Sequence, residues 1–122
     1  MSEVAVLKTS PDTVLDDYGK LMRMAGYKDF LPAQYETVIK LNLSWTKYFP
    51  SCSSQPWQLE GVVRTMLEDG WDRAKLIPVE NKTVVTKPVL GARNNRWMPV
   101  LEWYGLNFTP LPDVEWVKYE FK

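Results

Sequence analysis

Histidine is absent from the 122-residue chain, and cysteine occurs once, at Cys52. Without histidine, no Ser-His-Asp triad, Cys-His dyad or histidine zinc site can form within the chain. A single cysteine excludes an internal disulfide, and alone it excludes an iron–sulfur cluster or a thiolate-rich zinc site. The chain therefore lacks the commonest general base, and its cysteine usage indicates a reducing, cytoplasmic setting.

The chain also has no excess of charge of either sign and no long apolar run. Fifteen basic residues balance fifteen acidic ones, whereas nucleic-acid binders normally carry a basic excess. No stretch approaches the roughly 20 apolar residues that span a bilayer, and residues 1–4 do not resemble a signal peptide. The sequence predicts neither a nucleic-acid partner nor a membrane span.

The composition is that of a globular domain, with 45% hydrophobic and 25% charged residues. Aromatic residues are numerous: six Trp, six Tyr and four Phe. They indicate either a compact aromatic core or contact surface that this chain does not itself cover. The length is typical of one domain.

Apolar periodicity and turn residues predict alternating strands and helices. We expect strands at residues 3–8, 36–44, 75–80, 107–109 and 114–122, with a short β-rich piece at 83–86. Three helices are expected: one that Ser10 caps and Gly26 ends, one that Pro56 starts and Gly70 ends, and one that carries Trp97 and that Gly105 ends. Residues 29–32 are expected to form a loop. Pro78 indicates a strand at a sheet edge or a bulge.

This order predicts an α/β fold of three layers, with a mostly parallel sheet of about four to five strands and helices on both faces, as in Rossmann-like proteins. In the last predicted strand, Val117, Tyr119 and Phe121 alternate with Lys118, Glu120 and Lys122. The chain stops inside that strand without a turn. We therefore expect residues 1–122 to be a single α/β domain, the N-terminal part of a longer protein, whose sheet is then incomplete.

Candidate functional residues gather where the predicted strands end, because ligands of open α/β sheets bind outside the carboxyl ends of the strands. The strand at 36–44 carries Lys40, Asn42 and Ser44; the loop after it carries Thr46, Lys47, Cys52, Ser53 and Ser54; and the strand at 75–80 leads to Glu80, Asn81 and Lys82.

Lys40 is unusual because an unpaired ammonium within an apolar strand is costly to bury. It should pair with a carboxylate, Glu80 or Glu60 being the best candidates, or meet a bound anion. In the second case Lys40 would hold the anion and Glu80 would act as acid/base or metal ligand. Cys52 is either a nucleophile or ligand, activated by Lys47 and a helix start, or an inert small residue.

Serine and asparagine side chains offer further hydrogen bonds. Two interpretations are open for Ser53 and Ser54, which open a helix: they bind an anion there, or Ser54 is simply the N-cap. Asn42 and Asn81 are either turn formers or ligand-binding groups. Residues 93–96 supply either a helix cap or a second anion site. Trp45 and Trp57 flank the predicted crevice, and no Gly-rich nucleotide fingerprint occurs.

Several segments together resemble the N-terminal part of the domain-of-unknown-function 362 family. They are residues 39–43, the helix at 58–70, the strand at 76–81, and residues 104–108 and 114–117. The family's Lys-Pro-Asn-Leu strand has Leu41 in place of proline here, and its Gly-Asp pair corresponds to Glu80 and Asn81. The resemblance implies an α/β fold and a longer protein. Many members carry ferredoxin-type modules, which one cysteine cannot form.

Two hypotheses of function follow. In the first, the chain contributes part of an anionic-ligand or active-site crevice, with Lys40, Glu80 and Cys52 in catalytic roles and Asn42, Ser44, Ser53, Ser54 and Asn81 binding the ligand. In the second, it is a non-enzymatic module that binds another protein, self-associates into a homo-oligomer, or associates with the missing C-terminal part. Neither the residues nor the resemblance specifies a cofactor, substrate or reaction.

Overall fold

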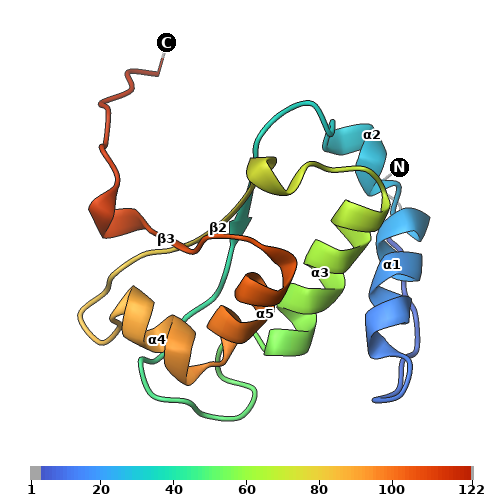
Figure 1. The fold of residues 1–122 in the computed structure, drawn as a ribbon, viewed down its shortest axis with the longest axis horizontal. Coiled ribbons are helices and arrows are strands. Elements are labelled where there is room, and N and C mark those ends of the chain that lie inside the picture. Colours follow the sequence, from blue (N-terminus) through green and yellow to red (C-terminus); the bar gives the residue numbers. More distant parts are fainter. Residues whose placement is uncertain (1–3, 122) are drawn as a thin grey trace.

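Three parallel strands form the sheet of the protein. The computed structural model describes residues 4–121. Its strands are β1 (Thr37–Lys40), β2 (Leu76–Glu80) and β3 (Thr109–Pro110). They lie in the order β1-β2-β3, and both neighbouring pairs are parallel. Together with its helices this sheet makes an α/β fold (Figure 1).

The described residues form five α-helices: α1 (Val14–Met24), α2 (Tyr27–Phe30), α3 (Pro56–Glu68), α4 (Pro88–Asn94) and α5 (Trp97–Tyr104). Two 3-10 helices, Arg73–Lys75 and Leu111–Asp113, precede β2 and follow β3. Helix α3 connects β1 to β2, while α4 and α5 connect β2 to β3. Each connection is the crossover that parallel strands require.

The sheet is smaller and less covered than the sequence predicts. It has three strands, and their order in space is their order in the chain. Leu76 on one face belongs to the main core, against which Ile39 packs. On the other face Val38 is 61% exposed, so the helical layer expected there does not cover β1.

The core lies between the sheet and the helices. Trp97 and Leu101 of α5 and Val63 of α3 are completely buried in it. Helix α1 packs along α3, as Figure 1 shows. This approach depends on Gly61, because a Cβ built there would lie 2.5 Å from Cγ of Tyr18.

The predicted terminal strands do not form. Residues 4–8 and 114–121 are irregular, because neither segment pairs with a strand among the described residues. The Val114 N–H donates to the nearby Leu111 carbonyl. Glu3 and Lys122, at the ends of those predicted strands, lie outside the described residues. The strand predicted at 36–44 ends at Lys40, where the chain turns toward the loop before α3.

Proline explains three further differences. Pro78 lies in the central strand, where an edge or a bulge was predicted, and it is tolerated because β3 pairs with β2 only from Val79 onward. Pro88 starts α4, a helix that was not predicted. Pro11 precedes α1 by a turn, so Thr13 and not Ser10 occupies the N-cap position.

The helices at Pro56 and Trp97 are confirmed, and Gly105 ends the second in a left-handed conformation. The strand at 75–80 is confirmed as Leu76–Glu80, whereas the strand predicted at 107–109 forms only at Thr109–Pro110. Residues 83–86 form a turn instead of a β-rich piece, and α2 occupies the first half of the predicted loop at 29–32. Of the helices described, none is both long and apolar enough to cross a membrane.

Candidate functional site

Lys40 and Glu80 form an ion pair at the carboxyl ends of β1 and β2. Lys40 Nζ lies 2.6 Å from Glu80 Oε1, so the predicted pairing of Lys40 with a carboxylate is confirmed. Glu80 is buried, whereas the Lys40 side chain is 54% exposed. The same carboxylate accepts hydrogen bonds from the backbone N–H of Leu43 at 2.6 Å and of Asn81 at 2.7 Å. Glu80 therefore fastens the end of β1 to the end of β2.

Four of the predicted polar residues lie together and are hydrogen-bonded to one another: Asn42, Ser44, Ser53 and Ser54. The Asn42 N–H donates to Ser54 Oγ at 2.9 Å, and the Ser44 N–H donates to Ser53 Oγ at 3.2 Å. Ser44 Oγ in turn donates to the Cys52 carbonyl at 2.7 Å. These bonds close the loop between β1 and α3 on itself. We call this set, residues 42–44 and 52–54, the serine bracket.

Helix α3 is capped without Ser54. Gln55 occupies the N-cap position, and its N–H donates to Gln58 Oε1 at 2.7 Å. The Ser54 carbonyl accepts a hydrogen bond from Trp97 Nε1 at 2.7 Å, which ties the bracket to α5. The alternative that Ser54 is the N-cap is therefore wrong, because its hydroxyl serves Asn42 instead.

The remaining predicted residues scatter around this edge. Cys52 is a free, exposed thiol, and Asn81 Oδ1 accepts from the Lys82 N–H. Trp57 packs edge-on against Tyr18 of α1, away from the predicted crevice. Within residues 4–121, no three metal-ligating side chains gather where they could hold an ion.

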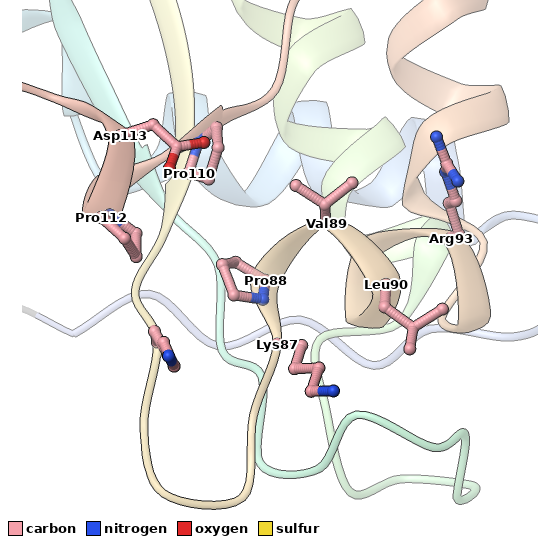
Figure 2. A pocket seen from close by; sticks show the side chains of 9 residues that line it. Lys87, Pro88, Val89, Leu90, Arg93, Pro110, Pro112 and Asp113 are labelled. Atoms are coloured by element: carbon pink, nitrogen blue, oxygen red, sulfur yellow. The ribbon is translucent and has the colours of Figure 1, made fainter.

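Two adjoining hollows lie along the carboxyl edge of the sheet. The first, of about 450 Å³, we call the α4 pocket; it is lined by Lys82, Lys87, Pro88, Val89, Leu90, Arg93, Pro110, Pro112 and Asp113 (Figure 2). The second, also about 450 Å³, we call the loop pocket; it is lined by Trp45, Thr46, Lys47, residues 82–87, Leu90 and Asn94. Lys82, Lys87 and Leu90 belong to both, so the two hollows meet.

Positive charge dominates these two pockets. Four cations line them: Lys47, Lys82, Lys87 and Arg93. All four are exposed, and none forms an ion pair with a carboxylate of the described residues. Asp113 is the one acidic residue in either lining. This is a local excess of positive charge on a chain whose net charge is zero.

A threonine clasp positions the two shared lysines. Thr83 and Thr86 bond through their hydroxyls at 2.7 Å, and the Thr83 N–H donates to Thr86 Oγ1 at 2.9 Å. Thr86 is buried, so this turn is anchored in the protein. Lys82 and Lys87 directly flank this clasp, and both side chains line both pockets.

Thr46 joins the first loop to this turn. Its hydroxyl donates to the Val85 carbonyl and accepts from the Lys87 N–H, both at 2.9 Å. Its carbonyl accepts from Asn94 Nδ2 of α4 at 2.8 Å. These bonds place Lys47 beside the turn that carries Lys82 and Lys87.

The α4 pocket combines this charge with an apolar wall. Pro88, Val89 and Leu90 of α4 face Pro110, the last residue of β3, and Pro112, which follows that strand. Val89 and Leu90 are 40% and 46% exposed. In Figure 2, Asp113 lies beside the two prolines, across the pocket from Leu90 and Arg93. The pocket can receive a molecule with an anionic group and an apolar body.

The sequence analysis placed Thr46, Lys47 and Lys82 at this edge and gave residues 93–96 either a capping role or a second anion site, but it overlooked Lys87. A signal was present: residues 81–101 contain four basic residues and no acidic one. Trp45 lines the loop pocket, as its predicted place beside the crevice implies. Comparison with family models, curated proteins and solved structures gave no match.

Proposed function

We propose that the protein binds a small anionic ligand, carrying a phosphate or carboxylate on an apolar body, in the α4 and loop pockets. The observation that carries this proposal is the group of four cations around two adjoining hollows with a single carboxylate among their lining residues. Lysine and arginine bind such anions through charge-assisted hydrogen bonds.

The position of the pockets supports the same function. Lys47 follows β1, Lys82 follows β2, and Pro112 and Asp113 follow β3, so the hollows lie outside the carboxyl ends of all three strands. Ligands of open α/β sheets bind at this edge. Each volume of about 450 Å³ lies within the usual range for small-molecule sites.

The serine bracket and Glu80 support the ligand site indirectly in this proposal. Their polar groups are occupied by bonds within the chain, which hold the loops that carry the cations. The catalytic roles of Lys40, Glu80 and Cys52 remain predictions from the sequence.

Isothermal titration with phenyl phosphate tests the proposal, because this probe carries both a dianion and an apolar ring. We expect binding that weakens with added salt, since the cations are exposed. Lys82→Ala and Lys87→Ala should each weaken it about 3- to 10-fold, the loss of one charge-assisted contact. Both substitutions keep the backbone bonds of the turn.

Matched controls make the result specific. Lys8→Ala removes an exposed lysine that lines neither pocket and should leave the affinity unchanged. Lys87→Arg should retain binding because the charge remains. Equal affinity in the wild type and in the Lys82→Ala/Lys87→Ala double variant would overturn the proposal.

A further inference from the structure

The C-terminal segment, residues 114–121, leaves the body of the protein as an extended chain (Figure 1). Its apolar side chains are exposed: Trp116 67%, Val117 82%, Tyr119 74% and Phe121 91%. Residues 115–121 make no backbone hydrogen bond to another described residue. Large apolar side chains and unpaired backbone groups together are the properties of an edge strand that lacks its partner.

The segment already has the two faces of a strand. The rings of Tyr119 and Phe121 meet edge-to-face with their centroids 5.1 Å apart. Lys118 Nζ lies 3.2 Å from Glu120 Oε1. Both contacts join residues two positions apart, which share a face only in an extended chain. One face therefore carries Val117, Tyr119 and Phe121, and the other carries the ion pair together with Trp116.

We propose that the free edge of this segment pairs with the same segment of a second copy of the chain. The two segments would pair as antiparallel strands about a two-fold axis at Tyr119. Tyr119 would then lie opposite Tyr119 of the second copy, and Lys118 opposite Glu120. Such an interface uses the same surface on both copies, as two-fold dimers do.

Charge selects this register. Residues directly opposite in an antiparallel pair lie on the same face of the ribbon. If the aromatic faces of the two copies are to coincide, the register of one strand against the other can change only in steps of two residues. A pairing centred on position 118 places two lysines opposite each other, and one centred on 120 places two glutamates opposite each other. A parallel pairing in register also brings like charges together. The pairing centred on Tyr119 is the register among these that joins opposite charges.

The aromatic face supports the same register. Val117 comes opposite Phe121 of the second copy, and the two Tyr119 rings become neighbours. Aromatic and β-branched residues are the types that stabilise cross-strand pairs. Because a two-stranded ribbon alone is marginally stable in water, association should be weak and should rise with protein concentration.

Analytical ultracentrifugation over a concentration series tests the pairing. The wild-type mass should rise from 14.2 kDa toward twice that value. Lys118→Glu should abolish the rise, because it places carboxylates opposite one another. The double variant Lys118→Glu/Glu120→Lys should restore it, since opposite charges meet again. The segment lies outside the core, so all three proteins should fold.

Nuclear Overhauser effects in a mixture of labelled and unlabelled chains provide the direct readout. We expect contacts between the Val117 methyl groups of one copy and the Phe121 ring of the other. A wild type that stays monomeric at every concentration would overturn the proposal. So would a dimer insensitive to Lys118→Glu, or one abolished by Val38→Lys, which would place the segment on the open sheet face instead.

Discussion

Glu80 Oε1 lies 2.6 Å from Lys40 Nζ, so one buried carboxylate joins the carboxyl ends of two neighbouring parallel strands. Its second oxygen accepts from the Leu43 N–H, beyond the end of β1. Both carboxylate oxygens of Glu80 are therefore occupied by contacts within the chain. The cations available to a ligand lie farther along the same edge, in the loops and in α4.

Removing the Glu80 carboxylate should destabilise the protein. Glu80→Ala leaves the N–H groups of Leu43 and Asn81 without their acceptor, and we expect a loss of about 3 kcal/mol. Lys40→Ala should cost less than about 1 kcal/mol because the Lys40 side chain is half exposed. Urea unfolding of the two variants measures both values. Equal losses would show that the ion pair matters more than the backbone contacts.

The approach of α1 to α3 should depend on the absence of a side chain at Gly61. Gly61→Ala places a methyl group against the Tyr18 ring, and we expect a net loss of about 1–3 kcal/mol despite the better helix propensity of alanine. The same substitution should cost less in a Tyr18→Ala background, where the ring is gone. A double-mutant cycle by urea unfolding measures the difference. Additive losses would contradict the packing argument.

Acid should destabilise the protein as two carboxylates become protonated. Hydrogen bonds, chiefly from Lys20, lower the pKa of Asp17 to about 2, and the Arg23 guanidinium chiefly lowers the pKa of Asp69 to about 2. Both values lie below the ordinary 3.8. Carboxylates with a depressed pKa stabilise the folded state at higher pH, and this contribution is lost as the pH falls from about 4 to about 2.

Unfolding free energies measured from pH 6 to pH 2 should therefore decline steeply at the acid end. Asp69→Asn removes one of the two groups, so its profile should decline less. Tyr27 and Lys28 also contact Asp69, and the variant should be less stable than the wild type at neutral pH. An acid profile of Asp69→Asn parallel to that of the wild type would contradict this assignment.

The threonine clasp should affect ligand binding without contributing a charge. Thr86→Val removes the hydroxyl that holds Thr83, so Lys82 and Lys87 should be less fixed in position. We expect phenyl phosphate affinity to fall about 3-fold, because one ordering hydrogen bond is lost. Titration calorimetry measures the affinity, and urea unfolding shows whether the fold persists. An unchanged affinity would mean that the clasp does not position the lysines.

Local signals in the sequence predicted much of the fold. Pro56 and Gly105 mark helix ends that the structure confirms, and the apolar strand at 75–80 is the centre of the sheet. The strands predicted at the two ends of the chain were wrong, because an alternation of apolar and polar residues gives a strand its two faces but does not supply a partner strand. Helix α4 was missed because Pro88 was not taken as a helix start, although proline is favoured at that position.

The candidate site could be predicted only in part. The cost of burying a lone ammonium predicted that Lys40 pairs with Glu80 or Glu60 or meets an anion, and the structure shows the pair with Glu80. The use of Ser53 and Ser54 within the chain could not be foreseen, because it depends on how the loop folds back onto residues 42–44. The family resemblance and the continuation beyond Lys122 stay predictions from the sequence.

Chemical-shift mapping by ¹H–¹⁵N NMR with phenyl phosphate tests the central claim most directly, because it locates the bound anion along the chain. We predict saturable shifts at residues 45–47 and 81–94, which carry the four cations of the α4 and loop pockets. Saturable shifts confined to residues 52–58, at the serine bracket and the start of α3, would contradict the account.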